Sequence, residues 1–121
     1  MQRITITASS PYEVLVGSGL LSQAGTEIRR VSHAIRVMMV TDDQVDLLYG
    51  QQVRKSLEQA GFLVSCFVFP HGEASKNLET TAQLYEAMVR HHLTRSDLVV
   101  ALGGGVVGDL AGFAAATFLR G

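Results

Sequence analysis

Apolar and polar side chains alternate in two short stretches near the start of the chain. Residues 2–8 (QRITITA) and 12–17 (YEVLVG) show this pattern, which predicts two half-buried strands and a hairpin-like beginning. The next segment, at about residues 20–31, has an amphipathic pattern, and Gly25 inside it lowers the helical propensity. A short strand pair followed by one helix is therefore expected.

Further along, apolar runs alternate with helical patterns. Residues 35–40 (IRVMMV) form an almost continuous apolar run, as in a strand covered on both faces of a parallel sheet, and residues 62–69 and 98–102 are further apolar strands. Helices are expected from residue 43 to 60 and from about residue 77 onward. Their predicted inner faces are Val45, Leu48, Tyr49, Val53, Leu57 and Ala60 in the first, and Leu78, Thr81, Leu84, Tyr85, Met88 and Val89 in the second.

This order of elements predicts the fold class. Strands that alternate with helices of this length form a parallel sheet with helices on both faces, joined by right-handed crossovers. We therefore predict an α/β, Rossmann-like domain that is preceded by a short hairpin-like segment. A chain of 121 residues is long enough for one such domain, so residues 1–121 are treated as one unit.

Composition narrows the class of protein. The chain is 47% hydrophobic and 17% charged with a net charge of -1, so it has no basic field that would attract a nucleic acid. Its single cysteine, Cys66, cannot form a disulfide within one copy and lies in an apolar run, which predicts a buried core residue. With no targeting signal at the amino terminus, a reducing cytoplasm is the expected location.

Only residues 98–119 are long and apolar enough to imitate a transmembrane helix. Asp109 would lie in the middle of that span, at a cost of about 2.5–3.5 kcal/mol, and three consecutive glycines break the helix near one end. We therefore expect no membrane association.

The candidate chemistry lies where the three parallel strands end. Open α/β sheets bind ligands at the carboxyl ends of their strands, which here are residues 41–44, 71–76 and 103–109. The last of these, GGGVVGD, contains a G-x-G-x-x-G pattern between a strand and a helical stretch, which is typical of a pyrophosphate cradle. Glycines that serve only a close helix-strand crossing are the structural alternative.

The polar side chains at these strand ends have alternative roles. Asp42 is placed to accept hydrogen bonds from a ribose, to cap the helix that follows, or to do both. Glu73 and Lys76 either form a solvated pair or contact a ligand. Asp109 stands in an otherwise apolar helix and needs partners, which favours a site role. The histidines show no metal-binding spacing, and His91 and His92 are expected at the surface.

These residues resemble a known family. The string GGGVVGDLAGFAAATFLRG, the loop PHGEASKNLET and the strand end VTD are similar to the amino-terminal domain of the 3-dehydroquinate synthase family, which belongs to the sugar-phosphate cyclases and acts in the shikimate pathway to chorismate and the aromatic amino acids. The resemblance covers nearly the whole chain. Gln44 departs from it, because many members have asparagine there, so a hydrogen bond to adenosine at that point is in doubt.

The resemblance implies an NAD site. It assigns the pyrophosphate to residues 104–108, the adenosine half to Asp42, Glu73 and Lys76, and the nicotinamide half to Asp109. Arg120 matches an arginine that binds the substrate phosphate, often across a homodimer interface. The cofactor-binding residues implied in this way are Asp42, Gly72, Glu73, Lys76, Gly104, Gly105, Val106, Val107, Gly108 and Asp109.

The implied reaction converts the sugar phosphate 3-deoxy-D-arabino-heptulosonate 7-phosphate to 3-dehydroquinate and phosphate, with NAD regenerated in each cycle. The family also uses a divalent metal, zinc or cobalt, whose glutamate and histidine ligands lie in a helical carboxyl-terminal domain that these 121 residues do not contain. No catalytic residue and no metal ligand is therefore expected in this chain, and the chain is expected to be inactive alone. The exposed sheet edge is expected to favour association with another chain.

Two other interpretations remain open at this point. The chain is alternatively the NAD-binding domain of another sugar-phosphate cyclase, or of a glycerol or iron-dependent alcohol dehydrogenase, which have a similar glycine turn. A non-catalytic nucleotide-binding module is the third possibility. Turnover by a completed protein separates these interpretations.

Overall fold

The computed structural model describes residues 3–6, 12–16, 24–31, 33–72, 77–94, 97–103, 107, 110, 111 and 113. Its strands are β1 (Arg3–Ile6), β2 (Tyr12–Val16), β3 (Arg36–Asp42), β4 (Leu63–Phe69) and β5 (Leu98–Leu102). Its helical elements are α1 (Ala24–Val31), α2 (Asp43–Val45), the π-helical segment η2 (Asp46–Gly50), α3 (Gln51–Gln59) and α4 (Leu78–Arg90).

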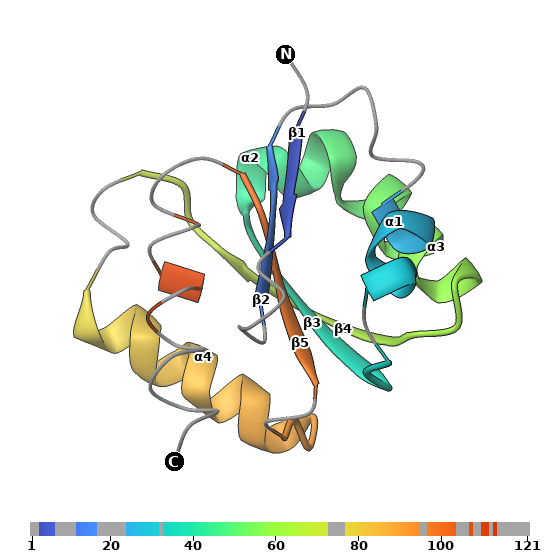
Figure 1. The fold of residues 1–121 in the computed structure, drawn as a ribbon. Helices are drawn as coiled ribbons and strands as arrows, with labels where there is room; N and C mark the ends of the chain where they lie inside the picture. Colours follow the sequence, from blue (N-terminus) through green and yellow to red (C-terminus); the bar gives the residue numbers. More distant parts are fainter. Residues whose placement is uncertain are drawn as a thin grey trace.

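The strands form one sheet in the order β1-β2-β5-β3-β4. β1 and β2 pair antiparallel, which confirms the predicted hairpin-like beginning, and all the other neighbours pair parallel. α1 and α3 lie on one side of the sheet and α4 lies on the other (Figure 1). The predicted Rossmann-like α/β fold, with helices on both faces, is confirmed.

Two apolar clusters follow from the alternation of side chains along β3 and β5. Met38 and Val40 of β3 point to the face covered by α4, whereas Val37 and Met39 point to the face covered by α1 and α3. β5 is buried along its whole length. A strand buried on both faces reads as a continuous apolar run, which is why the sequence predicted residues 98–102 with the bounds that the structure shows.

The helical stretch after β3 is interrupted in a way that the apolar pattern did not predict. Val45, Tyr49, Val53 and Leu57 face the cluster under α1 and α3, but Leu48 is 67% exposed, so its predicted place on the inner face was wrong. The π-helical segment η2 widens the turn that contains Leu48. The regular spacing of four residues keeps the other side chains inside, and Leu48 is rotated outward.

The predicted inner face of α4 was wrong at both of its ends. Leu78 is 85% exposed and Val89 is 61% exposed, whereas Thr81, Leu84 and Met88 are buried in the middle of the helix. Asn77 caps the amino end, and its side chain accepts a hydrogen bond of 2.8 Å from the amide of Thr80. The periodicity predicted the helix correctly. Thr80 and Thr81 in its first turn and Ala87 and Met88 in its last turn are buried, so Leu78 and Val89 lie outside the covered face of the helix.

Gly25, which weakened the helix prediction, lies where α1 crosses α3. Its amide donates a buried hydrogen bond of 2.9 Å to the Ser56 hydroxyl, and a Cβ atom built on Gly25 would lie 2.0 Å from the Ser56 carbonyl oxygen. The glycine therefore permits a close approach of two helices, which offsets its poor helical propensity.

β4 is the outer strand of the described sheet and is only partly covered. It begins at Leu63 rather than at the predicted Phe62, although Phe62 is buried and its ring lies 3.7 Å from the Arg29 guanidinium. Cys66 is partly buried rather than fully buried, because it faces the α1 and α3 cluster from this outer strand. Partial burial raises the pKa of its thiol.

The strand predicted at residues 35–40 begins at Arg36 and continues to Asp42. Ile35 is 61% exposed, and the strand gains Thr41 and Asp42 at its carboxyl end instead. Within the described residues, none of the helices has the length and hydropathy that a bilayer crossing requires.

Candidate functional site

Three of the segments predicted to form a site meet at one edge of the sheet. β3 lies between β4 and β5, and its last residues pair with the last residues of both neighbours, Thr41 with Leu102 and Asp42 with Phe69. Among the described residues, the structure therefore brings the ends of the three strands, at residues 42, 69 and 102, side by side. This arrangement was predicted from parallel pairing alone and is confirmed.

The chain leaves β3 and β5 toward opposite faces of the sheet. After β3 it passes through α2 and η2 to α3, on the face shared with α1, whereas Val107, Leu110 and Ala111 after β5 pack in the cluster under α4. Neighbouring parallel strands whose connections diverge in this way create a crevice at their carboxyl ends, where open α/β sheets bind ligands. Such a crevice is therefore expected where β3 and β5 end side by side.

Thr41 joins the two strands on either side of this crevice. Its side chain is fully buried, and its hydroxyl donates a hydrogen bond of 2.7 Å to the carbonyl oxygen of Leu102, the last residue of β5. Sequence reasoning missed this role, because the partner lies 61 residues away. The only local signal was a polar residue at the end of an apolar strand.

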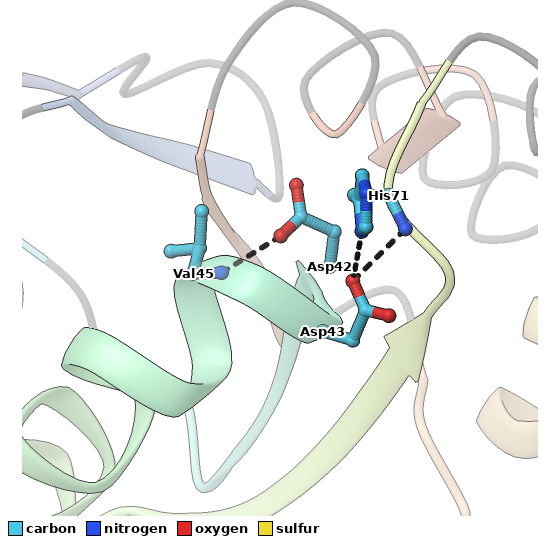
Figure 2. Close-up of polar contacts among 4 residues, drawn as sticks. All are labelled: Asp42, Asp43, Val45 and His71. Atoms are coloured by element: carbon cyan, nitrogen blue, oxygen red, sulfur yellow. Dashed lines mark hydrogen bonds and ion pairs between the residues drawn. The ribbon is translucent and has the colours of Figure 1, made fainter.

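Asp42 caps the helix that follows it. One carboxylate oxygen accepts a hydrogen bond of 2.8 Å from the amide of Val45, and the other oxygen points away from the helix (Figure 2). The capping role considered from the sequence is confirmed. A carboxylate has lone pairs for several donors, so the cap leaves acceptor capacity for a ribose hydroxyl, and that second role stays a prediction.

Asp43 links the end of β3 to the loop after β4. A single carboxylate oxygen of Asp43 accepts two hydrogen bonds from His71, one of 2.7 Å from the ring Nδ1 and one of 3.0 Å from the backbone amide (Figure 2). Both side chains are about half exposed. The ring hydrogen bond, followed by the backbone hydrogen bond, lowers the pKa of the Asp43 carboxyl from its ordinary value.

Sequence reasoning named the segments that contain Asp43 and His71 but not this pair. The two residues lie 28 positions apart, and neither forms a motif with its neighbours. An acidic residue in the first turn of a helix was the single available signal, and it indicates helix stabilisation rather than a contact with a distant loop.

Glycine is favoured at positions 103 and 72, after two of the strands, for different structural reasons. Gly103 has φ of +145°, and a Cβ atom built there would lie 2.8 Å from Val107 Cγ2, so a side chain is excluded by both backbone conformation and space. Gly72 has φ of +107° but open space around it, so conformation alone favours glycine. Val107 is 1% exposed and packs in the core, which leaves its backbone as the part that can face a ligand.

The described residues thus include Asp42, Gly72 and Val107 of the predicted site. The other predicted site residues, Glu73, Lys76, Gly104, Gly105, Val106, Gly108, Asp109 and Arg120, lie outside the described residues and stay predictions. No group of three or more His, Cys, Asp or Glu side chains suited to a metal ion occurs in the part of the chain that the structure describes. The described residues therefore do not fit a metal site.

A groove of about 860 Å³ lies elsewhere, along α3 and the outer strand β4. It is lined by Met39, Asp46, Leu47, Gly50, Gln51, Arg54, Lys55, Glu58, Cys66 and Val68. Of the predicted site residues that the structure describes, Asp42, Gly72 and Val107, none lines this groove.

Comparison with known proteins finds relatives of this chain. Residues 66–121 match the family model described as "3-dehydroquinate synthase N-terminal". A 3-dehydroquinate synthase of Streptococcus sanguinis (strain SK36) is 55% identical over 111 residues, which cover 92% of this chain and 31% of the relative. Over most of its length, the chain is therefore similar to the amino-terminal part of 3-dehydroquinate synthases. The resemblance inferred from the glycine string, the loop and the strand end is confirmed.

Solved structures of sugar-phosphate cyclases share the fold of this chain. A 2-epi-5-epi-valiolone synthase from Streptomyces hygroscopicus subsp. jinggangensis 5008, with NAD+ and Zn2+ bound, has a TM-score of 0.72 and 30% identity, covering 98% of this chain and 32% of that one. A 2-deoxy-scyllo-inosose synthase has a TM-score of 0.76 and 24% identity, covering 100% and 32%, which shows the fold alone. The chain spans about a third of the length of the curated 3-dehydroquinate synthases that it matches.

Proposed function

We propose that this chain is the NAD-binding part of a 3-dehydroquinate synthase, with the dinucleotide lying across the carboxyl ends of β3, β4 and β5. The observation that carries the proposal is the divergence of the chain from β3 and β5 toward opposite faces of the sheet, with Asp42 at the end of β3 and Gly103 directly after the end of β5. Such a crevice accepts a nucleotide, and its glycine side accepts the pyrophosphate.

The proposed roles follow from the chemistry of each residue. Asp42 uses its outward carboxylate oxygen to accept hydrogen bonds from the adenosine ribose, while its other oxygen keeps the helix cap. The loop after His71 contributes Gly72, Glu73 and Lys76 to the same half of the cofactor. Residues 104–108 contribute backbone N-H groups to the pyrophosphate, and Asp109 lies toward the nicotinamide half.

The described residues fit this cofactor at two points. The crowded Gly103 turn, closed against Val107, brings the chain sharply out of β5, and Thr41 fixes the strand that carries Asp42 against the same turn. When bound, NAD supplies a hydride acceptor and donor. The protein's own contribution is to orient the cofactor and to keep one edge of the sheet open for the substrate.

We extend the proposal to the complete protein, whose substrate is 3-deoxy-D-arabino-heptulosonate 7-phosphate and whose products are 3-dehydroquinate and phosphate. Arg120 binds the substrate phosphate, for which a planar guanidinium is suited, and in a homodimeric enzyme it serves the neighbouring subunit. The protein acts in the cytoplasm, where Cys66 stays reduced. A divalent metal requires ligands beyond the described residues, so no step is derived through it.

Another sugar-phosphate cyclase activity is the second candidate. It is favoured by the 30% identity to 2-epi-5-epi-valiolone synthase over nearly the whole chain. The curated 3-dehydroquinate synthases are 50–55% identical over a similar length, which favours the first candidate. A substrate comparison in a complete protein separates the two.

Two experiments test the proposal. The first is calorimetric titration of NAD into this chain, an Asp42→Asn variant and a Lys76→Ala variant, with the exposed Lys55→Ala on α3 as the matched control. We expect micromolar to millimolar binding that is weakened roughly tenfold in the two site variants and unchanged in the control. Equal affinity in all four proteins would contradict the assignment of the adenosine half.

The second experiment measures phosphate release by a chimaera in which this chain replaces the matching third of the Streptococcus sanguinis enzyme. The expected result is release from 3-deoxy-D-arabino-heptulosonate 7-phosphate that depends on NAD. Release from a different sugar phosphate alone would support the second candidate. A folded chimaera that binds NAD but turns over neither substrate would overturn both.

A further inference from the structure

Three consecutive residues at the end of β3 each bind a different part of the chain. Thr41 binds the carbonyl of Leu102 on β5, Asp42 binds the amide of Val45 in its own helix, and Asp43 binds His71 after β4. The first two contacts lie within or beside regular secondary structure. The third reaches into the loop that leads to Glu73 and Lys76, and its role is not explained by the fold.

The Asp43 contact fixes a backbone atom as well as a side chain. The His71 amide lies 3.0 Å from Asp43 Oδ1, and the ring Nδ1 of the same residue lies 2.7 Å from the same oxygen. Pro70, His71 and Gly72 are all exposed, so burial does not hold this part of the loop in place. Hydrogen bonds to the charged oxygen of Asp43 hold His71 where the chain leaves β4.

The conformation of Gly72 makes that anchoring point important. Its φ of +107° lies in a region that glycine adopts freely, and no atom outside its immediate neighbours lies within 4 Å of a Cβ built there. Glycine is therefore favoured at this position by its backbone conformation and not by close packing. Gly72 directly follows His71, which Asp43 holds.

We propose that Asp43 is a positioning residue, which holds His71 against the end of β3 and so sets the distance between Asp42 and Gly72. The inference rests on the proposed NAD site, because these two residues contact the adenosine half of the cofactor there. Asp43 itself does not touch the cofactor. It reduces the number of loop conformations that binding has to exclude, which raises affinity.

A purely structural role predicts a different set of effects. Exposed ion pairs contribute little to global stability, and both side chains of this pair are about half exposed. Asp43 also lies in the first turn of α2, but the helix already has Asp42 as its cap. Loss of Asp43 should therefore weaken the binding of adenosine nucleotides far more than it lowers the melting temperature.

The test compares four variants of the 121-residue chain by calorimetric titration with NAD and with ADP. Asp43→Ala removes both hydrogen bonds, His71→Ala keeps the backbone bond, and Asp43→Asn keeps an acceptor oxygen for the His71 amide. Glu86→Ala, which removes another exposed carboxylate that is paired with Arg90 on α4, is the matched control. Amide hydrogen exchange at residue 71, measured by NMR, reports the contact itself.

We expect Asp43→Ala to weaken the binding of both nucleotides roughly tenfold and to expose the His71 amide to hydrogen exchange. Asp43→Asn should restore most of the affinity and protection, and His71→Ala should retain the affinity in part. Should Asp43→Ala fail to fold, the Asp43→Asn and His71→Ala variants still give the graded comparison.

Two results overturn the inference in distinguishable ways. Failure of the unmodified chain to bind NAD or ADP contradicts the proposed function and this inference with it. Normal binding by the unmodified chain, together with unchanged affinity in Asp43→Ala, contradicts the positioning role alone. Equal loss in Asp43→Ala, Asp43→Asn and Glu86→Ala also contradicts it, because the effect would then follow charge rather than the contact with His71.

Discussion

The Thr41 hydroxyl donates a 2.7 Å hydrogen bond to the carbonyl oxygen of Leu102, and this bond ties β3 to β5 where both strands end. Because Thr41 is fully buried, its removal leaves the carbonyl without a side-chain donor in an apolar setting. We expect Thr41→Val to lower the free energy of unfolding by about 1–3 kcal/mol. Chemical denaturation of the two proteins measures the difference.

Thr41→Ser is the matched control for that prediction, because it keeps the hydroxyl and loses only a methyl group. The free energy of unfolding of Thr41→Ser should be close to that of the unmodified chain. Should Thr41→Ser be as unstable as Thr41→Val, the methyl group and not the bond to Leu102 would be the stabilising feature.

Gly25 should not tolerate even one added carbon. An alanine would gain about 1 kcal/mol in helical propensity, but its Cβ would lie 2.0 Å from the Ser56 carbonyl oxygen and would force α1 and α3 apart. Overpacking of this kind costs about 1–3 kcal/mol, so we expect a net loss of stability in Gly25→Ala. Thr26→Ala, at the exposed neighbouring position, should be neutral or slightly stabilising. A more stable Gly25→Ala protein would contradict the close crossing.

Asp97 should be the most important buried carboxylate among the described residues. It is 5% exposed, and its two oxygens accept hydrogen bonds from the amides of Arg36 and Thr94 and from the Thr94 hydroxyl. Asp97→Ala removes these three hydrogen bonds from a buried position, and we expect a loss of about 2–3 kcal/mol in the free energy of unfolding by chemical denaturation. Asp97→Asn retains acceptors and should lose less. Equal losses of stability in Asp97→Ala and Asp97→Asn would show that the charge of Asp97, rather than its hydrogen bonds, stabilises the start of β3.

The carboxyl group of Asp43 should titrate below its ordinary pKa of about 3.9, because the His71 ring and amide favour its charged form. A lowered pKa in the folded chain means that the contact stabilises the fold above that ordinary value and that the contribution is lost as the pH falls through the folded-state pKa. NMR titration of the Asp43 carboxyl carbon should show a lower midpoint in the unmodified chain than in His71→Ala. Identical midpoints would show that His71 does not bind Asp43 in solution.

The sequence predicted those parts of the fold that depend on local periodicity. β5 was predicted with its observed bounds because a strand buried on both faces has a continuous apolar pattern. The same periodicity placed Leu48, Leu78 and Val89 inside, and the structure exposes all three. Apolar spacing reports which face of a helix turns inward, but it does not report where a π-helical turn rotates a residue outward or how wide the covered face of a helix is.

The sequence predicted the location of the candidate site more fully than the contacts within it. Parallel pairing alone brought Asp42 and the residues after Phe69 and Leu102 to one edge. The contacts that organise this edge join Thr41 to Leu102 and Asp43 to His71, over 61 and 28 positions. Interactions over such distances depend on strand order and register, which no local pattern encodes. Gly25 is a further example, because glycine is required there by the approach of Ser56, which lies 31 positions away in the sequence.

The central claim is that the edge formed by β3, β4 and β5 binds NAD through the glycine turn that follows β5. The most direct measurement is the calorimetric isotherm of NAD with the unmodified chain and with Gly105→Asp, with Gln52→Asp at an exposed position of α3 as a control of equal charge. We predict saturable binding by the unmodified chain and by Gln52→Asp, and its loss in a Gly105→Asp protein with an unchanged circular dichroism spectrum. Equal binding by Gly105→Asp, or no binding by the folded unmodified chain, would contradict the claim.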